Sequence, residues 1–173
     1  AAFNKLDRLQ VALPHPEATA ALIKGGTELT AHFGNPPFQN QVLAGNPKAH
    51  IVLNSYDVLG GPASATALYA TEKFRAENPK TYRAFIAALD EAAKFIAAKP
   101  EAAADIFLKT GGGGGADRAL VLSIIKSPEV QFRLAPQNTL ALAEFMHRIG
   151  AIKNKPASAR DYFFDDAHNA GGN

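Results

Sequence analysis

The sequence predicts an α/β fold built as two lobes. The apolar run Leu9–Leu13 and the alternating stretch Glu28–Phe33 each lead through a proline-containing turn into a helical stretch, as strand-to-helix junctions do. Further along, Gly60-Gly61-Pro62 separates two β-like runs, and such a break suits a crossing between lobes. From Asn78 onward the apolar residues recur at helical spacing. We therefore expect strands and helices to alternate in the first part of the chain and helices to dominate the second.

Length and composition allow one large domain or two small lobes with a real core. The chain has 173 residues, of which 47% are hydrophobic and 20% charged, as in ordinary soluble globular proteins. Its 18 basic and 16 acidic residues give a net charge of +2 and are spread along the chain, so no nucleic-acid partner is expected. The absence of cysteine excludes disulfides, thiolate catalysis and cysteine zinc sites.

The first junction is expected around a histidine. The apolar run Leu9–Leu13 is followed by Pro14-His15-Pro16-Glu17 and then by a helix over Ala18–Lys24. Gly25-Gly26 is expected to end this helix as a C-cap, because glycine adopts the left-handed conformation without strain. His15 lies in the turn between the apolar run and this helix, and it is a candidate binding residue because such turns commonly carry function.

The second junction, Thr27–Phe38, is the element around which the rest of the chain is organised. The strand stops at Gly34, Asn35 is expected to be the N-cap of the next helix, and Pro36 its first residue. His32, Phe33 and Asn35 then cluster at the carboxyl end of the strand, where open α/β sheets bind small ligands. Spacing alone leaves a second interpretation open, in which both junctions are ordinary turns and proline only starts the helices.

The remaining elements follow from turn residues and periodicity. In chain order we expect a helix over Pro36–Leu43, strands over His50–Leu53 and Thr66–Thr71, a helix from Pro79 with Asn78 as N-cap, a helix over Glu101–Lys109, a flexible glycine linker at Gly111–Gly115, a helix over Asp117–Lys126, a strand or extended segment over Val130–Leu134, a helix from Pro136, and a last helix capped by Ser158–Asp161. The apolar stripe after Pro79, which includes Tyr82 and Phe85, is expected to be core.

Motifs for catalysis or metal binding are weak. The chain has no nucleophile elbow, no phosphate-binding loop and no histidines paired at helical metal spacing. Glu144 and His147 have the spacing of half a carboxylate-bridged metal site, but a solvated helix face explains them better. His15, His32 and His50 can converge on a metal only if the fold brings them together, which spacing does not fix. We predict no catalytic residue, no metal and no cofactor, and binding is favoured over catalysis.

Several motifs together point to a family. They are Leu13-Pro14-His15-Pro16-Glu17-Ala18, Thr30-Ala31-His32-Phe33-Gly34-Asn35-Pro36-Pro37-Phe38-Gln39, Ser55-Tyr56-Asp57-Val58-Leu59-Gly60-Gly61-Pro62, Glu77-Asn78-Pro79-Lys80-Thr81-Tyr82, Pro136-Gln137-Asn138 and Phe145-Met146-His147-Arg148-Ile149-Gly150. With these motifs the chain resembles the periplasmic substrate-binding proteins of ABC importers of the nitrate, sulfonate and taurine type. That group is similar to the thiamine-pyrimidine-synthesis-like domain family. The resemblance runs from about Leu6 to Phe164.

The resemblance implies a two-lobed periplasmic-binding-protein-like fold of type II that closes on a small ligand. It also implies that this chain is the later half of such a protein, with a missing N-terminal half as its partner. Residues 1–52 would then end lobe two, residues 53–65 would form the hinge crossing, and residues 66–173 would be the return segment of lobe one. Gly60-Gly61-Pro62 suits a hinge, where a few residues absorb the change on closure.

The resemblance also implies the binding residues. Family ligand contacts fall here on His32, Phe33, Asn35, Tyr56 and Gly61, with His15 at the preceding junction. The expected partners are a small-molecule ligand and the membrane permease of an ABC importer. The expected location is the periplasm, or a lipid anchor at the outer face of the cytoplasmic membrane.

The ligand class stays open at this stage. An anion needs N–H donors, and the Pro36-Pro37 pair removes two of them from the helix start. The rings of Phe33 and Tyr56 could instead sandwich a flat ligand. One alternative function is a thiamine-pyrimidine-synthase-like enzyme in which His15 or His32 reacts, but such an enzyme would carry a cysteine-containing iron site. Another alternative is a sensor lobe of the same fold.

Overall fold

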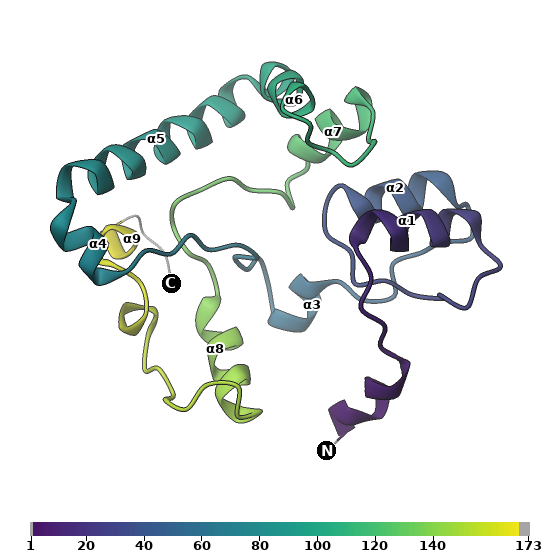
Figure 1. Cartoon of the computed structure of the whole chain (residues 1–173), viewed down its shortest axis with the longest axis horizontal. Coiled ribbons are helices and arrows are strands. Elements are labelled where there is room, and N and C mark those ends of the chain that lie inside the picture. The colour runs from purple at the N-terminus through teal and green to yellow at the C-terminus, as the bar shows by residue number, and fades with distance from the viewer. Residues whose placement is uncertain (1, 170–173) are drawn as a thin grey trace. The chain divides into compact units, whose positions relative to one another are not determined.

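The computed structural model describes residues 2–169, and every regular element among them is a helix (Figure 1). In chain order these are the 3₁₀ helix η1 (Ala2–Leu9), α1 (His15–Lys24), α2 (Phe38–Gly45), α3 (Ser55–Leu59), α4 (Glu72–Glu77), α5 (Pro79–Ala98), α6 (Pro100–Lys109), α7 (Arg118–Ile125), α8 (Thr139–Arg148), the 3₁₀ helix η2 (Ala159–Asp161) and α9 (Asp165–Asn169). No helix in this range is long and apolar enough to cross a membrane.

The predicted α/β fold of type II is wrong for this structure, because residues 2–169 contain neither a strand nor a sheet. The segments predicted to be strands are irregular, apart from Leu9, which ends η1; they are Leu9–Leu13, Glu28–Phe33, His50–Leu53, Thr66–Thr71 and Val130–Leu134. An alternating sequence indicates which side chains would share one face of a strand. A stable strand also needs hydrogen bonds to a neighbouring strand. The described part of the chain supplies no such neighbour.

The chain divides into two compact units, which are described separately below. Unit 1 consists of Ala1–His50 and Ala104–Lys126, and unit 2 consists of Ile51–Ala103 and Ser127–Asn173. Each unit therefore combines segments that are far apart in the sequence. The predicted division into lobes, with a crossing at residues 53–65, stays a prediction.

In unit 1, helices α1 and α2 pack against each other and bury Ala18 and Val42. The side chain of Asn46, just after α2, donates a 2.7 Å hydrogen bond to the carbonyl oxygen of Leu22. A second cluster joins α6 to α7. It consists of Ala104, Ala116 and Val121, with Leu108, Leu120, Leu122 and Ile125 packed against them.

The glycine run belongs to this packing. The side-chain amide of Gln41 on α2 donates to the carbonyl oxygens of Gly113 and Gly114, at 3.2 and 3.1 Å. A Cβ atom built on Gly112 would lie 2.5 Å from the ring of Phe107, and one on Gly114 would lie 2.8 Å from the ring of Phe38. The run was predicted to be a flexible linker, whereas Gly112 and Gly114 each lie against an aromatic ring that would have to move to admit a side chain.

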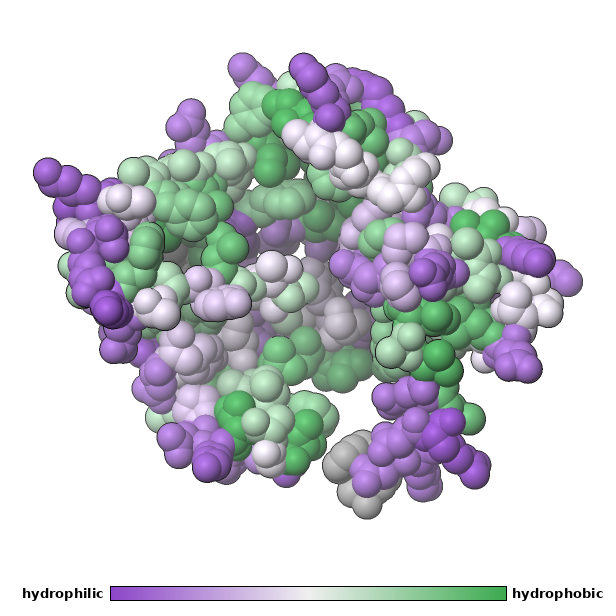
Figure 2. Space-filling model, viewed as in Figure 1, coloured by the Kyte–Doolittle hydropathy of each residue, from purple (hydrophilic) through white to green (hydrophobic). Residues whose placement is uncertain are grey.

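In unit 2, several helix boundaries follow the sequence signals. Helix α5 begins at Pro79 with Asn78 as its N-cap, as predicted. Ser158 and Asp161 form the predicted capping box, but the helix that they cap ends at Asp161 instead of continuing through Phe164. The stripe along α5 is only partly core, since Tyr82 is buried whereas Phe85 is 51% exposed. Figure 2 shows the same pattern more widely, with apolar side chains open to solvent on many elements.

Candidate ligand-binding site

Two of the predicted binding residues meet in unit 1. His15 is the first residue of α1, and His32 lies in the irregular segment that connects α1 to α2. Nδ1 of His15 and Nε2 of His32 are 2.9 Å apart, which is hydrogen-bonding distance. The ring centroids are 5.0 Å apart, and the ring planes are tilted by 54°. One of the two nitrogens must carry the proton of this bond while the other accepts it.

Phe38 supports this pair from a third segment. It is the first residue of α2, and its ring stacks on that of His15 with centroids 5.1 Å apart and planes inclined by 15°. The glycine run also constrains Phe38, because a Cβ atom on Gly114 would lie 2.8 Å from the Phe38 ring, which would have to move to admit a side chain. The position of the His15 ring is therefore fixed by helix start, aromatic stacking and its bond to His32.

The electrostatics of the pair favour a neutral His32. Burial lowers the pKa of His32 below its usual value of 6.5, and the neighbouring charge of His15 lowers it further. Both causes act against the protonated form. At neutral pH, His32 is thus available as a hydrogen-bonding imidazole with one donor and one acceptor nitrogen.

Asn35 takes a different position from the one predicted, whereas the predicted ligand contact of Phe33 stays a prediction. Phe33 is 89% exposed, so its ring is not part of the core of unit 1. Asn35 is not the N-cap of α2, because the helix begins at Phe38 and Pro37 occupies the cap position. The carbonyl oxygen of Asn35 instead accepts the backbone N–H groups of Phe38, at 2.9 Å, and Gln39, at 3.4 Å. Pro36 and Pro37 have no N–H group to donate, so the first donors in this turn are Phe38 and Gln39.

Tyr56 and Gly61 belong to unit 2 and lie at the two ends of α3. The side chain of Asn54 caps this helix by accepting the N–H of Tyr56 at 2.9 Å. The N–H of Gly61 donates to the carbonyl oxygen of Tyr56 at 2.8 Å. The hydroxyl of Tyr56 donates to the carbonyl oxygen of Glu129 at 2.7 Å. These two residues are thus placed by local structure, and their contact with a ligand stays a prediction.

The structure also gives the positions of the residues that were considered for metal binding. Among residues 2–169, no group of three His, Cys, Asp or Glu side chains is arranged to hold an ion. His50 is exposed, and its Nδ1 lies 3.5 Å from the carbonyl oxygen of Lys48. Glu144 forms a 3.0 Å ion pair with Lys155, which agrees with its interpretation as part of a solvated helix face.

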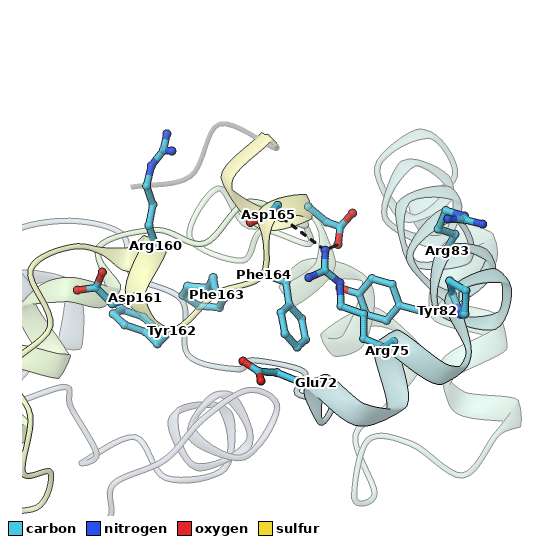
Figure 3. A pocket seen from close by; sticks show the side chains of 13 residues that line it. Glu72, Arg75, Tyr82, Arg83, Arg160, Asp161, Tyr162, Phe163, Phe164 and Asp165 are labelled. Atoms are coloured by element: carbon cyan, nitrogen blue, oxygen red, sulfur yellow. Dashed lines mark ion pairs between the residues drawn. The ribbon is translucent and has the colours of Figure 1, made fainter.

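A second feature, in unit 2, was not predicted. A cavity of about 750 Å³ lies between α4, the start of α5 and the segment Arg160–Asp166 (Figure 3). On its wall, the guanidinium carbon of Arg75 lies 4.6 Å from the ring centre of Phe164 and 5.4 Å from that of Tyr82. Arg75 also forms ion pairs with Asp165, at 3.7 Å, and Asp166, at 3.5 Å.

These contacts attach the C-terminal segment to α4 and α5. Burial raises the pKa of Tyr82 above its usual 10.0, and the Asp166 carboxylate beside it raises that pKa further. The side chain of Asp165 is 80% exposed and that of Asp166 is 39% exposed, and both form ion pairs with Arg75. The aromatic run Tyr162–Phe164 directly before two aspartates was the signal in the sequence. Because two carboxylates already neutralise Arg75, this cavity does not offer a free cation at that position.

Comparison with known proteins gives one family. The family described as NMT1/THI5 like matches residues 18–103, a segment that contains His32, Phe38, Tyr56 and Tyr82. No curated protein and no solved structure matches the chain.

Proposed function

We propose that the protein is the solute-binding component of an ABC importer, because residues 18–103 match the family described as NMT1/THI5 like. It captures a small organic or anionic molecule of the nitrate, sulfonate or taurine kind and delivers it to a membrane permease. It acts outside the cytoplasmic membrane, either free in the periplasm or lipid-anchored at the outer face of that membrane. In this role the chain binds and releases its ligand without changing it.

The contact between His15 and His32 is the observation that carries this proposal. The family resemblance implies ligand contacts at these two positions, and the two side chains approach to 2.9 Å from separate segments. Pro37 at the N-cap of α2 has no N–H group, and the N–H groups of Phe38 and Gln39 already donate to the carbonyl oxygen of Asn35, so this helix start offers few free main-chain donors to an anion. The imidazole N–H groups are the side-chain donors that can replace them. Phe33 follows His32 in the sequence, and its side chain, which is 89% exposed, offers an apolar surface to a ligand.

The amount of exposed surface supports a covering partner. The chain exposes 12680 Å², whereas two separate compact proteins of half its mass would together expose about 9,800 Å². The exposed residues include large apolar ones, among them Val52 at 84% and Tyr69 at 98%. We infer that a further polypeptide region, the N-terminal half implied by the family resemblance, covers part of this surface and supplies the rest of the ligand contacts.

Binding assays on the full-length gene product test this function. Isothermal titration calorimetry is run with nitrate, taurine, ethanesulfonate and a pyrimidine, using the wild type and His32→Ala. We expect saturable binding of one of these ligands and a weaker affinity in the variant, by about 1–3 kcal/mol for a lost hydrogen bond to a charged group. His50→Ala is the matched control, because His50 is an exposed histidine of the same unit. The proposal fails if no solute binds, or if the product turns over a bound pyrimidine precursor as an enzyme would.

A further inference from the structure

We propose that His15 and His32 form a two-histidine site for a divalent transition-metal ion, with Cu²⁺ as the best fit. The observation is the arrangement of two ring nitrogens from separate segments, Nδ1 of His15 and Nε2 of His32, which lie 2.9 Å apart. Histidine is the commonest protein ligand of such ions and binds them through either ring nitrogen. This inference does not depend on which solute the protein carries.

The distance between the nitrogens fits one coordination geometry better than another. Metal–nitrogen bonds to histidine are about 2.0–2.1 Å long. Two such ligands at 90° in a square-planar site are therefore about 2.9 Å apart, whereas two ligands in a tetrahedral site are about 3.4 Å apart. Square-planar sites with nitrogen and oxygen ligands are typical of Cu²⁺ and Ni²⁺, and of the two Cu²⁺ binds more tightly.

The surroundings hold the rings while leaving room for adjustment. Stacking of Phe38 on His15, with centroids 5.1 Å apart, orients the His15 ring, and His15 itself starts a helix. A metal ion needs a free lone pair on both nitrogens, so the ring that carries the shared proton must shift it to its other nitrogen. His32 lies in an irregular segment, so its ring can then tilt until both lone pairs point at one ion while the two nitrogens stay about 2.9 Å apart.

The remaining coordination positions would be taken by water or by a ligand oxygen. No third His, Cys, Asp or Glu joins the pair among the residues that the structure describes.

Copper titration of the chain without a purification tag tests the site. Cu²⁺ binding is followed by calorimetry and by electron paramagnetic resonance, in which coordinated imidazole nitrogens split the signal. We expect one Cu²⁺ per chain with two nitrogen ligands, weaker binding of Zn²⁺, and an affinity at least tenfold lower in His15→Gln and in His32→Gln. His50→Gln is the matched control and should bind as the wild type does.

A second measurement avoids any variant that fails to fold. In the wild type, substoichiometric Cu²⁺ should broaden the NMR signals of the His15 and His32 rings before those of His50 and His147. The proposal is overturned if all histidine signals broaden together, if either site variant keeps the wild-type affinity, or if His50→Gln loses as much affinity as they do.

Discussion

Arg75 and Phe164 form a cation–π contact in unit 2, with the guanidinium carbon 4.6 Å from the centre of the ring. Arg75 lies on α4, and Phe164 directly precedes α9, so the contact joins segments almost ninety positions apart in the chain. The flanking ion pairs to Asp165 and Asp166 involve carboxylates that are 80% and 39% exposed. Solvent screens such pairs, so the stacked ring is expected to contribute more than the charges.

Arg75→Ala should therefore lower the free energy of unfolding by about 1–3 kcal/mol, from the lost cation–π contact and the lost packing of the side chain. Arg75→Lys should recover little of this, because an ammonium group lacks the planar face that stacks. Lys73→Ala is the control, since Lys73 pairs with Glu77 only at the surface and its loss should cost under about 0.5 kcal/mol. Urea denaturation measures all three variants; equal losses for Arg75→Ala and Lys73→Ala would contradict the assignment.

The glycine run yields a prediction about the packing of Gly114 against Phe38. Gly114 and Gly115 both have a positive φ, of 51° and 87°, but only at Gly114 would a Cβ meet a ring, 2.8 Å from Cε1 of Phe38. Alanine at either position incurs the left-handed strain of about 1–2 kcal/mol. Gly114→Ala should cost about 1–3 kcal/mol more, because Phe38 must move.

Thermal melts of these two glycine variants separate the cost of backbone strain from the cost of moving Phe38. The chemical shifts of the His15 ring report whether Phe38, its stacking partner, has moved. If both variants lose the same stability and leave His15 unchanged, Phe38 is not confined by the glycine run.

The pKa of His32 predicts how stability depends on pH. Burial and the charge of His15 lower this pKa in the folded chain, so the unfolded chain takes up the proton more readily. The contribution of His32 to the free energy of unfolding should therefore be fully present above the reference pKa of 6.5. It should fall as the pH drops below 6.5 and level off below the pKa of His32 in the folded chain. NMR titration should place the midpoint of His32 below 6.5. His15→Gln should raise that midpoint only in part, because burial is the larger cause.

A midpoint for His32 at or above 6.5 would show that the pair is open to water. A full return to 6.5 in His15→Gln would show that charge, and not burial, dominates.

Helices were predictable because their signals are local. Asn78 followed by Pro79, and Ser158 followed three positions later by Asp161, each mark a helix start with residues that are neighbours in the chain. Strands were not predictable in the same way, since the alternation in Glu28–Phe33 says which side chains would share a face but not whether a partner strand exists.

The candidate site was predictable only in part, for the same reason. The sequence placed His15 and His32 at neighbouring turns, but their 2.9 Å contact depends on the path of the chain between Lys24 and Phe38. The attachment of Phe164 to Arg75 likewise depends on tertiary structure. The start of α2 was misplaced because Pro36 suits a first helical residue, whereas the following proline moves the first helical residue to Phe38.

Phe33 decides most directly whether this chain presents a ligand-binding wall. A buried core phenylalanine costs about 3–5 kcal/mol of stability when truncated to alanine, but Phe33 is 89% exposed. Phe33→Ala should therefore change the free energy of unfolding by less than about 0.5 kcal/mol. If the ring contacts the solute, the same change should weaken binding by about 1–3 kcal/mol.

The decisive measurement is paired calorimetry and thermal melting of Phe33→Ala in the full-length protein, with the solute that the wild type binds. We predict an unchanged melt without ligand and a loss of affinity. A large drop in melting temperature with unchanged affinity would contradict the account, because Phe33 would then be a core residue and not part of the ligand wall.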